Sequence, residues 1–260
     1  MWTYIILFII GAFIGSFLNV VIIRLPERRS IFRERSACMK CKAILKPLDL
    51  IPILSFFILK GRCRSCKESI SWQYPIIEFL SGAVFVFVGY YHNVLDGLAN
   101  PIFYRDLVFV MALLLLFTSD LKFGKIFDAI TLPMIVFAFI VNIFLFSTSE
   151  NYLDVVLYLL LSGLVCAAFF GLQYLASKGA WLGAGDVKLG TMIGFMLGWP
   201  MVISCVVLAY IMGAFASIIL LFFKKKRLSS KIPFGTFLCL STFVILFWGT
   251  ELTDWIINLF

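Results

Sequence analysis

Charged residues are scarce in this chain of 260 amino acids. Asp, Glu, Lys and Arg make up only 14% of it, whereas 62% is hydrophobic. A soluble domain is closer to about a quarter charged and half apolar. The composition therefore excludes an ordinary soluble protein and indicates a polytopic membrane protein. Histidine is almost absent, and the single one, His92, is expected to be solvated on the outer side of the membrane.

The first apolar segment lacks the features of a removable signal peptide. It has no basic start and no small-residue cleavage site, and it ends at Arg24, so we interpret it as a retained helix. Apolar stretches of roughly membrane-spanning length occur at residues 2–23, 72–91, 105–119, 129–147, 154–177, 187–199, 200–223 and 232–249. The sequence thus predicts an all-α membrane protein with about eight transmembrane helices. The sixth stretch is short and is also compatible with a tight turn.

Basic residues fall almost entirely on one side of this predicted arrangement. Of the 22 Lys and Arg residues, 21 lie in segments on the same side as residues 24–71, and only Arg105 lies on the other. The positive-inside rule then places residues 24–71 in the cytoplasm and both termini outside. Because position explains the net charge of +8, we expect membrane lipid rather than nucleic acid as a partner.

Four of the seven cysteines form two paired motifs. Cys38 and Cys41 make one C-x2-C motif, and Cys63 and Cys66 make a second after 21 intervening residues. Two such pairs complete a tetrahedral thiolate site of the kind that holds structural zinc. A disulfide or a redox pair is the alternative, but the reducing cytoplasm disfavours it. The sequence predicts a small cytoplasmic zinc-binding loop domain, whose few apolar residues need such a metal.

Two aspartates border apolar segments. Asp120 ends one apolar run, and Asp186 follows Gly-Ala-Gly just before another. Carboxylates in spanning helices cost roughly 2.5–3.5 kcal/mol on insertion scales and are therefore usually functional. A close pair shares one proton, so that one carboxylate can activate water while the other polarises a peptide carbonyl. The alternative is helix capping, which fits Asp186 before Val187 and also fits Asp128. Asp120 fits it less well, because it follows its helix. The residues alone leave both interpretations open.

These motifs resemble those of the type IV prepilin peptidases, which are leader peptidases and N-methyltransferases. The resemblance covers most of the chain. It rests on Gly15–Pro26, the paired C-x2-C motifs, Tyr74-Pro75-Ile-Ile-Glu78, Asp120, Gly183-Ala-Gly-Asp186-Val-Lys188 and Ile232-Pro-Phe-Gly235. The chain departs from the family at Ile126-Phe127-Asp128, where Ile-Pro-Asp is usual, and at Thr236, where proline is common. Both departures concern local backbone shape rather than the two aspartates.

The resemblance implies an activity and its partners. The leader of a prepilin or pseudopilin would be cut after a glycine at the cytoplasmic face, with Asp120 and Asp186 as catalytic residues. The new N-terminal residue, usually Phe, would be methylated with S-adenosylmethionine, although no glycine-rich loop marks a site for this donor. The protein would lie in the bacterial inner membrane. Its domains would be the first helix at 1–23, a methyltransferase-associated zinc domain at 24–71 and a peptidase bundle at 72–260.

Two polar residues in apolar segments are candidates for the donor pocket. Asn19 and Glu78 would lie near the zinc loop, or alternatively would hydrogen-bond neighbouring helices. Lys188 either keeps a nearby carboxylate ionised or extends to the membrane surface. Gly11 and Gly15 are expected to serve helix packing.

Two other functions would use the same carboxylates. A presenilin-like intramembrane aspartyl protease would cut a spanning helix, but that group has no zinc loop. A proton-coupled transporter would carry protons on Asp120 and Asp186 but should show paired halves with broken helices, which the sequence lacks.

Overall fold

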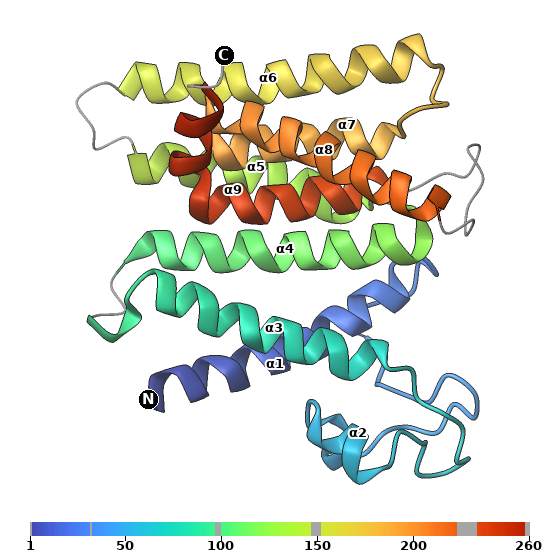
Figure 1. The fold of residues 1–260 in the computed structure, drawn as a ribbon. Helices are drawn as coiled ribbons and strands as arrows, with labels where there is room; N and C mark the ends of the chain where they lie inside the picture. Colours follow the sequence, from blue (N-terminus) through green and yellow to red (C-terminus); the bar gives the residue numbers. More distant parts are fainter. Residues whose placement is uncertain (1, 32, 97–99, 147–151, 223–232, 258–260) are drawn as a thin grey trace. The chain divides into compact units, whose positions relative to one another are not determined.

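The described part of the chain is almost entirely helical (Figure 1). The structure is a computed structural model that describes residues 2–31, 33–96, 100–146, 152–222 and 233–257. Its α-helices are α1 (Trp2–Arg24), α2 (Leu54–Ile58), α3 (Gln73–Tyr91), α4 (Pro101–Phe123), α5 (Asp128–Phe146), α6 (Tyr152–Ala176), α7 (Ala184–Leu197), α8 (Met201–Phe222) and α9 (Phe234–Ile257). Two short 3-10 helices are η1 (Pro47–Leu50) and η2 (Val94–Asp96). Among the described residues the only extended pairings are two isolated bridges, so the all-α prediction is confirmed.

Seven helices in the described ranges are long and apolar enough to cross a membrane. They are α1, α3, α4, α5, α6, α8 and α9. The sixth predicted segment, 187–199, forms α7, which has only 14 residues and extends about 21 Å at 1.5 Å per residue. This is short of a hydrocarbon core about 30 Å thick. The prediction of about eight spans is thus confirmed for seven. Predicted ends at 147, 223 and 232 lie outside the described residues.

Contacts divide the chain into two units, Met1–Leu107 and Val108–Phe260. In the first unit α1 packs closely along α3, because glycines line the contact. A Cβ built at Gly11 would lie 2.7 Å from the carbonyl oxygen of Ser81, and one built at Gly15 would lie 2.7 Å from the Ser81 Cβ. The prediction that these two glycines serve helix packing is confirmed.

His92 follows the end of α3, and its side chain is largely covered rather than solvated. Its side chain is 9% exposed, and its Nε2 lies 2.8 Å from Oδ2 of Asp106. Asp106 also pairs with Arg105 over 2.8 Å. The prediction that His92 is solvated is wrong, because the start of α4 supplies a buried carboxylate that no local pattern connects with the histidine.

In the second unit, α7 packs against α5, α6 and α9. Leu189 and Met192 on α7 are completely buried. The last carbonyl groups of a helix have no partner within it. Here the Asn142 amide of α5 donates to the carbonyl oxygens of Phe195 (2.7 Å) and Met196 (3.2 Å). These two bonds satisfy carbonyl groups in the last turn of α7 and hold that end of the short helix against α5.

Candidate active site

Asp120 lies in the last turn of α4, because that helix continues to Phe123. The prediction that Asp120 follows its helix is therefore wrong, although the carboxylate does lie near the negative end of the helix dipole. The start of α9 compensates for this position. The backbone N–H of Thr236 donates to Oδ2 of Asp120 over 2.8 Å. The contact joins residues 116 positions apart, so local sequence patterns could not indicate it. The expectation that the departure at Thr236 concerns only local backbone shape is therefore wrong, because a proline at this position would have no N–H to donate to Asp120.

Asp186 lies inside the first turn of α7, which begins at Ala184. The predicted helix start at Val187 is wrong by three residues, and the N-cap is Gly183. The Asp186 carboxylate reaches back to this cap, where the N–H of Gly183 donates to its Oδ2 over 2.9 Å. Asp186 therefore does satisfy a free N–H group at the helix start, as half of a capping box.

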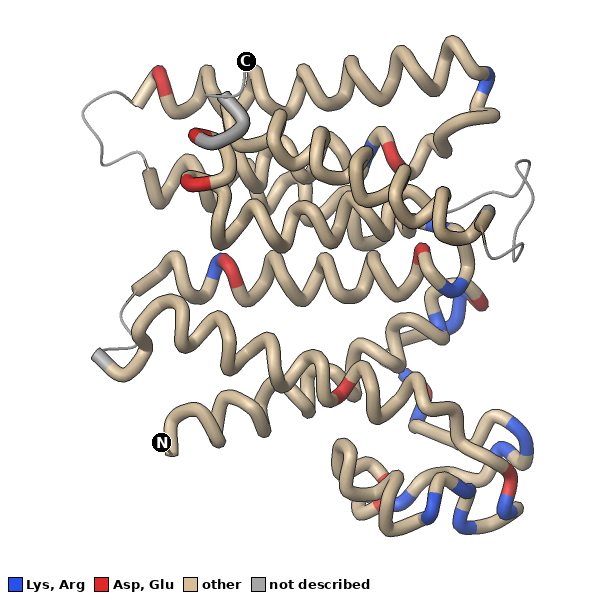
Figure 2. The backbone as a smooth tube through the Cα atoms, in the orientation of Figure 1, with Lys and Arg blue, Asp and Glu red and all other residues tan. Residues whose placement is uncertain are grey.

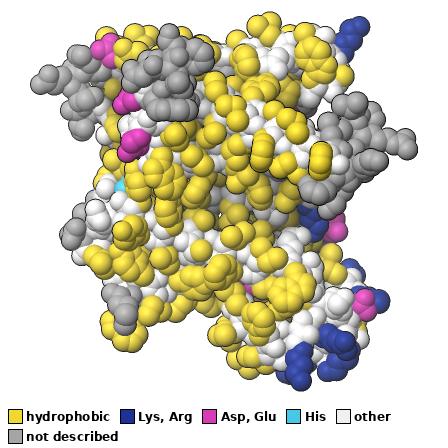
Figure 3. Space-filling model, viewed as in Figure 1, with side chains coloured by type: hydrophobic (Ala, Val, Ile, Leu, Met, Phe, Trp, Pro, Cys, Tyr) yellow, Lys and Arg dark blue, Asp and Glu magenta, His cyan; other side chains and the backbone are white. Residues whose placement is uncertain are grey.

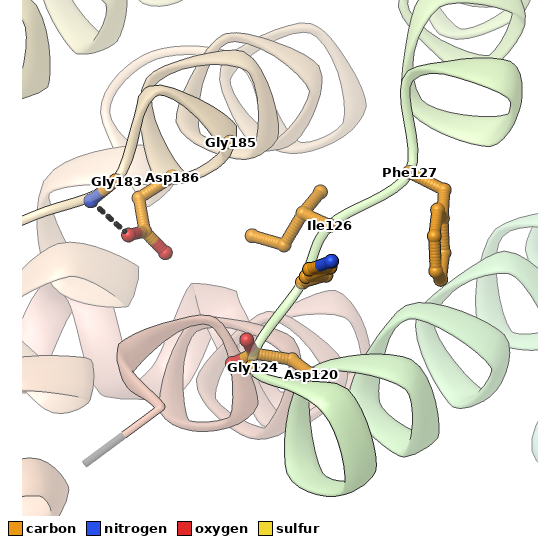
Figure 4. Close-up of a pocket in the computed structure, with 8 residues that line it drawn as sticks. Asp120, Gly124, Ile126, Phe127, Gly183, Gly185 and Asp186 are labelled. Atoms are coloured by element: carbon orange, nitrogen blue, oxygen red, sulfur yellow. Dashed lines mark hydrogen bonds between the residues drawn. The ribbon is translucent and has the colours of Figure 1, made fainter. Parts of the chain in front are cut away.

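A cavity of about 250 Å³ lies between the two aspartates. It is lined by Asp120, Gly124, Lys125, Ile126, Phe127, Gly183, Gly185 and Asp186. In Figure 4 the two carboxylates point into the same space from two different helices. Each has one oxygen held by a backbone N–H from a helix start. The structure thus brings the predicted pair together and fixes the orientation of both carboxylates.

Two glycines let the walls of this cavity approach closely. A Cβ at Gly185 would lie 2.9 Å from the Cβ of Ile126, and a Cβ at Gly235 would lie 2.8 Å from Oδ2 of Asp120. Real side chains do not tolerate such distances. Ile126 therefore packs against α7 and α9 only because both helices carry glycine there.

Lys188 forms an ion pair outside this carboxylate pair. Its Nζ lies 2.6 Å from Oδ2 of Asp128, the first residue of α5. The lysine and aspartate side chains are 37% and 54% exposed. An exposed pair contributes only about 0–1 kcal/mol. The pair links α5 to α7 beside the cavity, and neither residue lines the cavity itself.

The two C-x2-C motifs fold into matching knuckles. In the first, Cys38 N–H donates to Ala43 O and Lys42 N–H to Cys38 O. In the second, Cys63 N–H donates to Glu68 O and Lys67 N–H to Cys63 O. These four distances are between 2.8 and 3.0 Å. Because the two knuckles share this pattern of backbone hydrogen bonds, each turns its two cysteines in the same way.

The four cysteine sulfurs converge on one point. All lie within 4.8 Å of one another, and the Sγ atoms of Cys38 and Cys66 are 3.8 Å apart. Zinc–sulfur bonds of about 2.3 Å in a tetrahedron place sulfurs about 3.8 Å apart. Hydrogen bonds from the backbone of Cys41 and Lys40 lower the pKa of the Cys38 thiol to about 6, whereas burial and the other three cysteines raise the pKa of the Cys66 thiol to about 11. The cluster could therefore hold a metal ion.

Asn19 and Glu78 are both buried, and Glu78 contacts the loop that carries the four cysteines. The Asn19 amide donates to the carbonyl oxygen of Tyr74 over 3.1 Å and accepts a bond from Gln73 over 3.3 Å. The Glu78 Oε2 accepts the N–H of Ile53, a loop residue, over 2.7 Å. These contacts tie α1, α3 and the loop to one another.

Two family models match the chain and together cover most of it. The bacterial peptidase A24 N-terminal domain matches residues 9–92, and the type IV leader peptidase family matches residues 107–218. With seven candidate spans, these matches define a multi-pass peptidase of the bacterial inner membrane.

Curated relatives match over nearly the full chain. The prepilin leader peptidase/N-methyltransferase of Legionella pneumophila is 30% identical over 98% of this chain and 94% of its own length. The protein of that name from Bacillus subtilis (strain 168) is 32% identical over 80% of this chain and 79% of its own. No solved structure matches. The chain belongs to the type IV leader peptidase family.

Proposed function

We propose that this enzyme removes the leader of prepilins or pseudopilins at the cytoplasmic membrane face and then methylates the new N-terminus. Asp120 and Asp186 are the proposed catalytic residues for cleavage. The observation that carries this assignment is the cavity that both carboxylates face, each with one oxygen already fixed by a backbone N–H. The names of the relatives support both reactions.

Hydrolysis by this pair uses one ionised and one protonated carboxylate. Water attacks the scissile carbonyl carbon while the ionised carboxylate takes a proton from that water. The protonated carboxylate donates a hydrogen bond to the carbonyl oxygen, which becomes the oxyanion. Transfer of a proton to the amide nitrogen then breaks the C–N bond. The leader leaves with a free carboxylate, and the pilin keeps a free amine.

Methyl transfer is proposed to take place at the first unit. When bound, S-adenosylmethionine would supply an electrophilic methyl group to the neutral amine, and its sulfur would leave as a neutral thioether. Glu78 is proposed to face the sulfonium or to accept the proton of the amine, with Asn19 beside it. The Cys38, Cys41, Cys63 and Cys66 sulfurs are proposed to hold structural zinc, which keeps the loop folded around this region.

Mass spectrometry of a prepilin N-terminus tests the proposed function. Purified enzyme in bilayers is incubated with a full-length prepilin and S-adenosylmethionine. We expect a product that lacks the leader and whose first residue is heavier by one methyl group. An intact prepilin after prolonged incubation would contradict the peptidase, and an unmethylated mature product would contradict only the transferase.

Gly235→Ala is expected to lower leader cleavage sharply. The added Cβ would meet the Asp120 carboxylate at 2.8 Å and Ile126 Cδ1 at 2.9 Å, so the carboxylate would have to move. A displacement of about 1 Å can cost about 100-fold in rate, and we expect a fall of that size in kcat/KM. Gly213→Ala is the control, because its Cβ would lie 3.5 Å from the Phe237 ring, an ordinary contact. Equal rates for the two variants would argue against the placement of Asp120 in the reaction.

Glu78→Gln is expected to cleave normally and to methylate at least about tenfold more slowly. Glutamine keeps an acceptor oxygen for the Ile53 N–H but removes the charge, so the loop stays in place while the anion is lost. Both reactions are measured on one preparation by mass spectrometry. Asp120→Asn should show the reverse pattern: it should fail to cleave a prepilin but should methylate a pilin whose leader has already been removed. Normal methylation by Glu78→Gln would refute a charged role for this carboxylate.

A further inference from the structure

The loop between α1 and α3 carries an exposed apolar surface. Leu54, Phe57 and Ile58 have the spacing of one face of a helix and are 60%, 59% and 72% exposed. Trp72 extends this surface, since its ring centroid lies 6.4 Å from that of Phe57 and it is 61% exposed. We refer to these four residues as the apolar face of α2, to which Trp72 belongs by contact, because it directly precedes α3. Figure 3 shows hydrophobic side chains gathered on this part of the molecule.

A hydrogen bond fixes how deep α2 lies along the neighbouring span. Ile53 directly precedes α2, and its N–H donates to Glu78. Glu78 is the sixth residue of α3, or about 8 Å into that helix at 1.5 Å per residue. Because α3 is a candidate membrane span, the start of α2 lies at the depth of the second turn of a membrane-crossing helix. In Figure 1, α2 lies at the level of the first turns of α3.

Basic side chains border the same surface. Residues 24–71 contain 12 Lys and Arg but only four Asp and Glu. Lys60 and Arg62 come immediately after α2 and are exposed. The ion pairs that the described part of the loop forms near α2 use Arg64 and Asp49 instead. Figure 2 shows the positive charges of this loop gathered mainly beyond α2. The loop therefore combines an apolar face at membrane depth with cations beside it.

We propose that the apolar face of α2 inserts into the membrane interface and that Lys60 and Arg62 bind the headgroups of anionic lipids. An apolar face flanked by Lys and Arg is the composition of helices that lie in the interface. Tryptophan is enriched at the same level. A protein partner would also cover apolar residues. The depth of α2 and the adjacent cations favour lipid. The loop is then held at the membrane by Glu78 on one side and by the bilayer on the other.

Fluorescence quenching in nanodiscs tests the insertion. The full-length Trp72→Phe variant is the reference, and Phe57→Trp added to it places a probe in the apolar face. Ile44→Trp added to the same reference is the control, because Ile44 is similarly exposed (62%) but lies in the first cysteine knuckle. With lipids brominated near the headgroup end of the acyl chains, we expect the Phe57→Trp signal to be quenched at least about twofold more than the Ile44→Trp signal. Equal or absent quenching would overturn the proposal and leave the face to a protein partner.

A charge test addresses the headgroups. Lys60→Glu with Arg62→Glu, added to the Phe57→Trp probe, should reduce quenching in bilayers that contain phosphatidylglycerol and have little effect in neutral phosphatidylcholine. Lys42→Glu with Lys67→Glu makes the same change in net charge within the knuckles and is the control. The assignment of Lys60 and Arg62 would be overturned if their double substitution left quenching unchanged. It would also be overturned if the Lys42 and Lys67 double substitution reduced quenching by the same amount. Gel filtration verifies that every variant is folded.

Discussion

Asp120→Asn and Asp186→Asn are each expected to abolish leader cleavage. General acid–base catalysis contributes about 10²-fold to 10⁴-fold to a rate, so the rate should fall by about 100-fold or more. Asparagine keeps an oxygen that can accept the Thr236 or Gly183 N–H, so each variant should stay folded. What it loses is the proton that the pair must share. The substitution therefore isolates the chemistry from the packing.

The measurement is the initial rate of prepilin cleavage in detergent or bilayers, with thermal unfolding recorded for each variant. Asp128→Asn is the matched control, because it is also a single Asp to Asn change near the cavity. Its carboxylate is 54% exposed and pairs with Lys188 across the surface, so its loss should change the rate by no more than about fivefold. Substantial cleavage by either Asp120→Asn or Asp186→Asn would rule out the carboxylate pair.

The spacing of residues along the chain predicts much of this molecule. Two C-x2-C motifs have few structural solutions, and the four sulfurs do converge. Long apolar runs predict helices because every backbone polar group inside a bilayer needs a partner. The glycine spacing of Gly11 and Gly15 predicts close helix packing, and α3 supplies it. In each case the residues that form the pattern are themselves the ones that make the contact.

The features that the sequence does not reveal depend on contacts between distant segments. Thr236 supports Asp120 across 116 residues, and only the folded chain places the start of α9 beside the end of α4. Burial of His92 similarly depends on Asp106 from the next helix. The prediction that α7 begins at Val187 is wrong because Gly183 rather than Asp186 is the N-cap, and glycine is only a weak signal for a helix start.

Cys63→Ser is expected to remove zinc, to unfold residues 36–70 and to abolish methylation, while cleavage stays within about threefold of the wild type. Among the described residues of this loop only Pro52, Phe56 and Cys63 are buried, so the loop has too small a core to fold unaided. Structural zinc contributes apparent binding energies of about 10–16 kcal/mol in zinc-finger peptides. Losing one thiolate should therefore remove most of the stability of the loop.

The second unit should not depend on this metal, because Asp120, Asp186 and the cavity between them all lie in Val108–Phe260. Elemental analysis should give one zinc per chain for the wild type and for the control Cys166→Ala, which removes a buried cysteine from α6. Hydrogen exchange should rise in residues 36–70 of Cys63→Ser and stay unchanged in α7. A wild type without zinc would refute the metal site. Cleavage that disappears together with the zinc would show instead that the loop takes part in both reactions, and the proposed division between the two units would be wrong.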